Sequence, residues 1–201
     1  MKFRFFAFIL LFTGLLPLKS IAQFTPALQF SSSSMKLDWK MDNGDTFEDI
    51  AQISSIGFGP SVSMESRRFL FQGAILRHFN SDGGSLISDN SNGSLTRIPS
   101  EFNFTLGFKL NVSGNVQYYP MFTYGRYNLK LKTETTIDDV KTIDNEYLIL
   151  DQFGAGLGAQ YRLEKLKFDF QAKVKSASGR FQGGDFTGAD LSIGILVGYM
   201  L

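Results

Sequence analysis

Residues 102–112 read FNFTLGFKLNV, and this stretch decides the fold. The apolar positions along it are Phe102, Phe104, Leu106, Phe108, Leu110 and Val112. The positions between them are Asn103, Thr105, Gly107, Lys109 and Asn111. A β-strand turns successive side chains to opposite faces, whereas a helix repeats about every 3.6 residues. The strict alternation therefore predicts a strand with one apolar face and one polar face.

The same period of two residues recurs along most of the chain. The last segment, Asp190 to Leu201, alternates in the same way. Pro120 lacks the amide donor that a strand ladder needs, so we expect a bulge or a local irregularity beside it. Residues 31–34 show no alternation of apolar and polar residues. This leaves open whether residues 24–34 extend the first strand or form a periplasmic segment before it. We predict eight strands, near 35–41, 51–65, 68–79, 101–113, 115–131, 147–163, 165–176 and 189–201.

The connections between these segments alternate between short and long. The short turns lie near 66–67, 113–115 and 164–165. The long polar connections are 42–50, 80–100, 132–146 and 177–188. In an up-and-down arrangement alternate connections fall at the same end, as in outer-membrane barrels with short periplasmic turns and long outside loops. The sequence therefore predicts an all-β fold, an eight-stranded antiparallel up-and-down transmembrane β-barrel.

Two other folds share part of this pattern, a soluble lipocalin-like barrel and a β-sandwich. A soluble barrel needs a charged outer face, but the second face here is mostly Gly, Ser, Asn and Thr, which suits a narrow lumen. A sandwich gives no reason for the alternation in loop length. Phe104 and Phe170 separate the alternatives, because both rings point outward in a membrane barrel and inward in a soluble one.

Composition narrows the possible chemistry. The chain has 201 residues, a net charge of +1, one His, no Cys and 21 Phe. The lack of Cys excludes disulfides, thiolate metal sites and thiol catalysis, and a single His disfavours a His-based metal site. A near-neutral charge without basic blocks argues against a nucleic-acid partner. We therefore assign no cofactor, no metal site and no catalytic residue.

The N-terminus has the features of an export signal. Lys2 and Arg4 precede an apolar stretch that is too short to span a bilayer, and Ala22 ends a small-x-small cleavage site. We predict a signal peptide at residues 1–22 and a single barrel domain at residues 23–201. Removal of the signal leaves 17 basic and 19 acidic residues, and so a net charge of −2.

The final strand carries the most specific local signal. Its pattern of a polar residue, Gly and two hydrophobic or aromatic positions is met by Ser192, Gly194, Val197 and Tyr199. With the predicted architecture, the chain resembles the small outer-membrane β-barrel families, namely the outer membrane protein beta-barrel domain group and the OmpA/OmpX-like eight-stranded barrels. The resemblance implies an outer-membrane location in a Gram-negative envelope, insertion by the barrel-assembly machinery, and contact with outer-membrane lipid and lipopolysaccharide. A monomer is expected.

Charged residues also occur on the faces that we expect to point inward. They are Glu65, Lys109, Arg162, Lys167, Asp169, Lys173 and, at the end of the same strand, Lys175. Unpaired charges are costly in a narrow interior, so we expect them to pair as a lumen charge network that fills the barrel. A narrow, porin-like solute channel is the alternative.

The predicted long connections are acidic. They contain 12 of the 19 acidic residues against Arg97, Lys132, Lys141 and Arg180, a net charge of −8 on one rim. The acidic residues are Asp42, Asp45, Glu48, Asp49, Asp82, Asp89, Glu134, Asp138, Asp139, Asp144, Glu146 and Asp185. Such a rim repels anions and favours divalent cations or a basic extracellular partner.

His78 is the one residue that suggests an enzyme. Outer-membrane lipid A deacylases and palmitoyltransferases resemble barrels of this size and use a His with a Ser and an acid. Here Asn80 takes the place of the deacylase Ser, and Ser81 falls on the other face of the strand. We therefore expect a non-enzymatic barrel with a structural or surface-interaction role. A lipid A-modifying acyl hydrolase or acyltransferase that uses His78 is the alternative.

Overall fold

The structure is a computed structural model that describes residues 23–42, 44, 46–82, 85–88, 91–111, 114–137, 140–181 and 184–201. Its strands are β1 (Gln23–Met41), β2 (Thr46–Glu65), β3 (Phe69–Asp82), β4 (Ser85–Ser88), β5 (Ser91–Phe108), β6 (Val116–Ile137), β7 (Val140–Leu163), β8 (Leu166–Phe181) and β9 (Gly184–Tyr199). Among the described residues, no helix is long and apolar enough to cross a bilayer. The predicted signal peptide, residues 1–22, lies outside the described residues.

The sheet closes into a barrel of eight antiparallel strands. Along the sheet the order is β3-β2-β1-β9-β8-β7-β6-β5-β4, and a further pairing between β3 and β5 joins the two ends. The short strand β4 pairs with β5 outside this ring. The closing ladder runs from Phe69 opposite Phe108 to Leu76 opposite Glu101. The predicted fold class is confirmed, and the β-sandwich is wrong.

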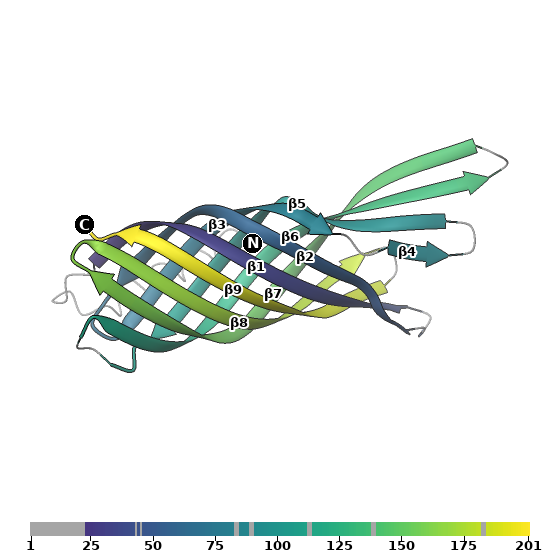
Figure 1. Ribbon diagram of the computed structural model, residues 1–201. Helices are drawn as coiled ribbons and strands as arrows, with labels where there is room; N and C mark the ends of the chain where they lie inside the picture. Colours follow the sequence, from purple (N-terminus) through teal and green to yellow (C-terminus); the bar gives the residue numbers. More distant parts are fainter. Residues whose placement is uncertain are drawn as a thin grey trace, which may run out of the picture.

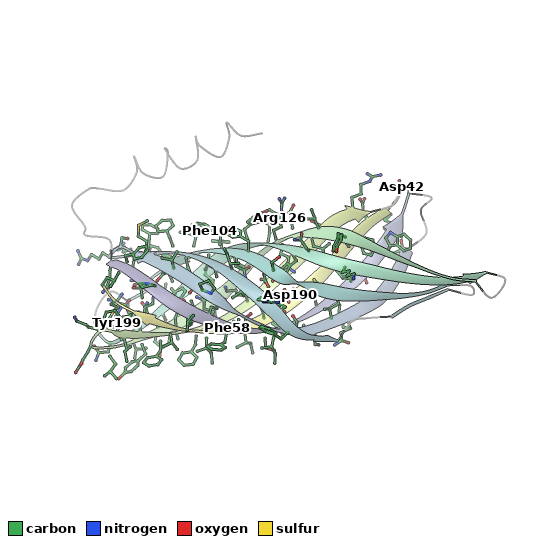
Figure 2. The ribbon with its side chains drawn as sticks, turned by 90° about the horizontal axis from the view of Figure 1, so that it is seen from above. Asp42, Phe58, Phe104, Arg126, Asp190 and Tyr199 are labelled. Carbon is green, nitrogen blue, oxygen red and sulfur yellow. The ribbon has the colours of Figure 1, made fainter. Side chains whose placement is uncertain are left out.

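The exterior of the barrel is apolar. Phe104 is 38% exposed and Phe170 is 50% exposed, so both rings point outward from the closed barrel. Figure 2 shows Phe58, Phe104 and Tyr199 directed away from the strands, whereas Asp190 lies within them. Large apolar side chains of all eight ring strands share this surface. A soluble barrel has the reverse arrangement, so that alternative is wrong.

The two ends of the barrel differ. The tight connections and the C-terminus lie at one end, called here the short-turn end, while Asp42 lies at the opposite, long-hairpin end (Figures 1 and 2). β6 and β7 stay paired as far as Ile137 and Val140, although β7 pairs with β8 only up to Asp151. The β6–β7 hairpin, with β4 and β5 beside it, therefore extends beyond the rest of the barrel (Figure 1).

Several predicted strand boundaries were too short. β1 begins at Gln23 and not at Met35, and Ser31–Ser34 pair in unbroken register with both β2 and β9. Much of the predicted loop sequence at the long-hairpin end is also strand, for example 132–137. Those segments carry polar residues on both faces of the strand, so their sequence lacks the two-residue period that marks a strand buried on one side.

Of the two features predicted beside Pro120, the structure has no bulge, but the β5–β6 ladder ends there. The β6–β7 register runs without a shift from Val116 to Ile137, with Pro120 opposite Leu157. On the other side, the pairing of β6 with β5 ends at Met121, so the missing amide hydrogen of Pro120 falls at the end of that ladder. The register shifts in the β1–β2, β2–β3 and β5–β6 ladders instead.

Close packing of the interior gives a test of the inward and outward faces. A Cβ added at Gly158 would lie 2.2 Å from the ring of Tyr119, whereas one added at Gly73 would meet nothing within 4 Å. Gly158→Ala should therefore lower the free energy of unfolding by about 1–3 kcal/mol, because the buried Tyr119 cannot move aside. Gly73→Ala is the matched control and should stay close to wild type. Urea titration of the lipid-embedded barrel measures both, and equal midpoints would contradict the packing described.

Candidate functional site

The candidate site is the interior of the barrel, and its charged part begins at the short-turn end. Here the Glu65 carboxylate accepts hydrogen bonds from Lys109 Nζ (2.5 Å), Arg162 Nη2 (2.5 Å), Lys167 Nζ (2.6 Å) and Gln160 Nε2 (2.7 Å). We call these five residues the Glu65 cluster. They come from β2, the segment after β5, β7 and β8, so the cluster ties together strands that are far apart in sequence.

Burial controls the electrostatics of the Glu65 cluster. Glu65, Lys109 and Lys167 are each no more than 3% exposed. Lys109 lies just beyond the end of β5, where burial lowers the pKa of its ammonium and the adjacent Glu65 carboxylate opposes that shift. One carboxylate is thus shared by three cationic side chains.

A polar layer lies above the Glu65 cluster. The Tyr119 hydroxyl donates to Asp169, and Gln171 Nε2 donates to the same hydroxyl at 3.0 Å. Gln171 also donates to Gln72 (2.7 Å), which in turn donates to Gln29 (3.0 Å). β8 and β3 lie opposite each other in the ring, so the Gln171–Gln72 bond crosses the lumen.

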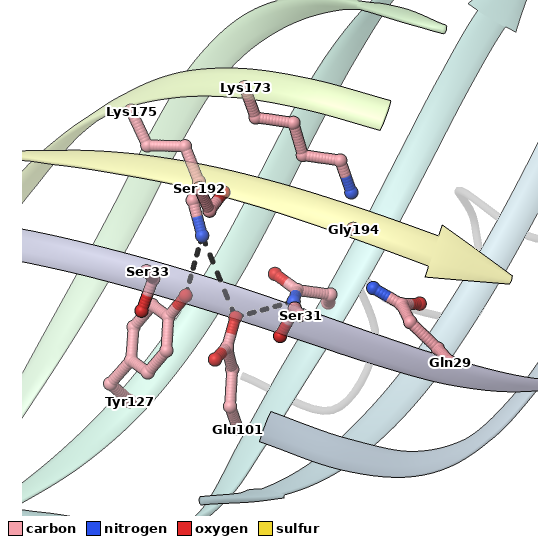
Figure 3. Close-up of a pocket in the computed structure, with 10 residues that line it drawn as sticks. Gln29, Ser31, Ser33, Glu101, Tyr127, Lys173, Lys175, Ser192 and Gly194 are labelled. Atoms are coloured by element: carbon pink, nitrogen blue, oxygen red, sulfur yellow. Dashed lines mark hydrogen bonds and ion pairs between the residues drawn. The ribbon is translucent and has the colours of Figure 1, made fainter. Parts of the chain in front are cut away.

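A second charged layer surrounds Lys175. Its Nζ lies 2.5 Å from the Tyr127 hydroxyl, 3.2 Å from Asp190 and 3.6 Å from Glu101. Figure 3 shows Lys175 reaching down to Tyr127 and Glu101, with Lys173 beside it. The cavity between these side chains has a volume of about 10 Å³, close to the roughly 10–15 Å³ that one water needs. The lumen is filled at this level.

His78 lies in this charged layer. Its Nε2 is 2.5 Å from Glu101 and its Nδ1 is 3.1 Å from Ser55 Oγ. Asn103 donates to the other oxygen of Glu101. The sequence reasoning placed Asn80 and Ser81 around this residue, but its partners come from β2 and β5, and the side chains of Asn80 and Ser81 lie outside the described residues.

An apolar layer closes the interior towards the long-hairpin end. We call it the outer apolar cluster, and it comprises Met35, Leu37, Ile53, Tyr127, Leu148, Leu150, Ala177 and Phe186, all at most 2% exposed. Trp39 packs against the cluster and stacks on Phe186, with ring centroids 5.6 Å apart. The sequence predicted a strand near 35–41, but not that its face with Met35, Leu37 and Trp39 turns inward.

The predicted site residues share the interior but divide between the layers. Glu65, Lys109, Arg162 and Lys167 form one group, Asp169 joins Tyr119, and Lys173 donates to Thr105 at 3.3 Å. In the final strand, Ser192 and Gly194 point inward, whereas Val197 and Tyr199 are 38% and 46% exposed on the apolar exterior. Within the described residues, no group of three His, Cys, Asp or Glu side chains could hold a metal ion.

Residues that the sequence reasoning missed complete the network. Glu101, Tyr119, Tyr127 and Asp190 are the partners of the charged side chains on β8. Glu101 and Tyr119 occupy inward positions of the strand pattern, so a face assignment could have found them. Their pairing depends on the register between strands.

Removal of Glu65 tests the importance of the network. Glu65→Gln would leave three cations around a neutral amide and should lower the free energy of unfolding by about 3–5 kcal/mol. Asp151→Asn is a matched control, because Asp151 pairs with Arg126 on the exposed surface, where loss of an ion pair changes stability by about 1 kcal/mol or less. Urea titration in lipid vesicles measures both, and equal losses would refute the buried network.

No family model matches the chain, and no curated protein matches it. Among solved structures, Ail, the attachment invasion locus protein of Yersinia pestis, is 12% identical with a TM-score of 0.41, and the match covers 90% of this chain and 99% of Ail. The outer membrane protease OmpT from Escherichia coli is 9% identical with a TM-score of 0.44, over 89% of this chain and 97% of OmpT. The N-terminal β-barrel domain of Pseudomonas aeruginosa OprF is 11% identical with a TM-score of 0.36, over 84% and 96%.

The surface of the barrel indicates which solvent surrounds the protein. In hydrocarbon every backbone polar group must be satisfied within the protein, and a closed barrel achieves this with strands. Here a closed eight-stranded barrel combines an apolar, aromatic-rich exterior with a polar, charged interior. Short turns at one end and long hairpins at the other are typical of outer-membrane barrels. The protein is a small outer-membrane β-barrel.

Proposed function

We propose that this protein is a non-conducting surface barrel that presents an acidic outer end to extracellular partners. The observation that carries the proposal is the filled interior, in which the charged layers end beneath the outer apolar cluster. The β6–β7 hairpin and the neighbouring ends of β4 and β5 extend beyond the rest of the barrel (Figure 1). A filled barrel with long outer strands can present its outer hairpins to a partner but offers no path for ions or solutes.

The layers of the interior support a non-conducting barrel. Bonds across the lumen join opposite strands, such as Gln171 on β8 with Gln72 on β3. Above them, the outer apolar cluster offers no polar group to replace the hydration shell of an ion, except the hydroxyl of Tyr127, which is engaged by Lys175. Transfer of an unpaired charge into such a layer is strongly unfavourable.

The surroundings of His78 support a role in the network and not in catalysis. The side chains of His78 and Glu101 are 1% and 2% exposed, and Ser55 is buried beside them. Both ring nitrogens already have partners inside the lumen. A lipid A substrate lies outside the barrel wall, so a hydrolytic role would require access through the packed interior.

The acidic outer end supports the choice of partner. Asp42 is exposed there and pairs with Arg180 at 3.1 Å. Asp185 on β9, which lies opposite Lys40 of β1, is also exposed. The other acidic residues of the predicted rim have side chains outside the described residues. Their net charge favours a partner with a basic surface, and this attraction weakens as salt rises.

Planar-bilayer recording tests the filled interior. The purified barrel should show no steady ion conductance, because the side chains of the outer apolar cluster fill the lumen with mostly apolar groups. Leu148→Ser combined with Leu150→Ser would place hydroxyls in that layer and should increase leak current, whereas the conservative Leu148→Met, Leu150→Met pair should not. Steady conductance of the wild-type barrel would contradict the proposal.

Binding of a cationic probe tests the acidic end. Oligolysine should bind the barrel in vesicles of neutral lipid, and Glu134→Gln, Asp144→Asn and Glu146→Gln together should weaken that binding on the order of threefold to tenfold. The control variant exchanges the same residues as Glu134→Asp, Asp144→Glu and Glu146→Asp, which keeps the charge. Equal affinities for both variants would show that the charge of the β6–β7 hairpin does not attract the partner.

A further inference from the structure

A pocket opens at the short-turn end, on the opposite side of the membrane from the proposed partner surface. It has a volume of about 170 Å³, far above the roughly 10–15 Å³ that one water needs. Its walls include Glu65, Ser66, Arg67, Lys109, Gln117 and Arg162. Arg67 lies exposed in the turn between β2 and β3, so the pocket is accessible from the periplasm.

The walls of the pocket carry an excess of positive charge. Arg67, Lys109 and Arg162 are cationic, and Glu65 is the one acidic residue among the named lining residues. Lys167 adds a further cation immediately behind Glu65. Four cationic side chains against one carboxylate leave a net charge of about +3 at neutral pH, partly in a buried setting where uncompensated charge is unfavourable.

Neighbouring acids offset this excess only in part. A carboxylate has about four lone-pair sites, and Glu65 already accepts four hydrogen bonds. Asp169 lies in the next layer, where it accepts hydrogen bonds from Tyr119 and Gln171. The pocket therefore keeps an excess of positive charge, and an anion from outside the cluster would balance it.

Two buried atoms at the pocket also have no hydrogen-bond partner within the described structure. They are Nε of Arg162 and Oε1 of Gln117. Gln117 is 5% exposed, and both residues line the pocket. The Nε–H of Arg162 is a donor that suits an anionic oxygen, and the Gln117 amide is an acceptor that suits an N–H or O–H group of the same ligand.

We propose that this pocket is a binding site for an oxyanion, a phosphate or carboxylate group, held by Arg162, Lys109 and Arg67. The volume accommodates such a group with several attached atoms, and the Gln117 acceptor favours a ligand that also carries a donor. The same chemistry is available from a phospholipid headgroup of the inner leaflet and from a soluble periplasmic anion. The site goes beyond the proposed surface role and does not depend on it.

Inorganic phosphate is the probe for the test. The wild-type barrel is placed in phosphatidylcholine vesicles, and its urea unfolding midpoint is measured in sodium phosphate and in sodium chloride of equal ionic strength. A ligand that binds the folded state raises the midpoint in proportion to its occupancy, which yields a dissociation constant. Arg162→Gln should weaken phosphate binding about tenfold, because it removes charge-assisted hydrogen bonds.

Lys165→Gln is the matched control, since Lys165 is an exposed cation in the adjacent β7–β8 turn and does not line the pocket. It should leave phosphate binding unchanged. The measurement is repeated in vesicles that contain phosphatidylglycerol. Loss of the phosphate response there supports the site with a lipid headgroup as the source, and its persistence supports the site with a soluble anion.

Two results would overturn the proposal. One is a wild-type midpoint that does not differ between phosphate and chloride in phosphatidylcholine vesicles. The other is an equal phosphate response in the Arg162→Gln and Lys165→Gln variants, which would show an effect of general screening. Neither result bears on the acidic outer end, because the probe and the variants act at the other end of the barrel.

Discussion

Backbone hydrogen bonding in hydrocarbon is the constraint on which the rest of the structure depends. An edge strand in lipid would leave amides and carbonyls unsatisfied, so the sheet must close on itself. Closure between β3 and β5 produces a lumen that eight strands make too narrow to leave empty. The interior is then packed with side chains, and their charges require partners on distant strands. The Glu65 cluster and the Lys175 layer both follow from this one requirement.

The two halves of the barrel differ in which side chains face outward, because they are exposed to different solvents. Within the membrane the apolar side chains face outward and the polar ones inward, as Phe30 and Gln29 do on β1. Further along the same strand the pattern reverses, so that Leu37 is buried inside and Lys36 is exposed. The reversal falls at Ser31–Ser34, where small hydroxyl side chains suit either environment. Beyond it, β1 has apolar side chains inside and charged ones outside, as in a water-soluble protein.

The two-residue period of the sequence determines which parts of the structure could be predicted. It assigns Phe104 and Phe170 to the exterior and Lys109 and Lys167 to the interior, since a strand fixes the side on which each residue lies. It does not reveal that Lys109 and Lys167 meet on Glu65, because that depends on the stagger between strands. The Ser31–Ser34 segment and the polar hairpins give no alternation, so β1 and the outer strand ends were underestimated. The environment of His78 was missed because Ser55 and Glu101 are distant in sequence.

The outer apolar cluster has a consequence for how the molecule responds to temperature. Strands in lipid gain little from the exclusion of water by their outward faces, because those faces stay in a hydrocarbon solvent. The outer apolar cluster is shielded from water itself, so its stability carries the heat-capacity signature of the hydrophobic effect and weakens on cooling. The barrel thus combines two thermodynamic regimes along one set of continuous strands, and the outer one is the more sensitive to cold.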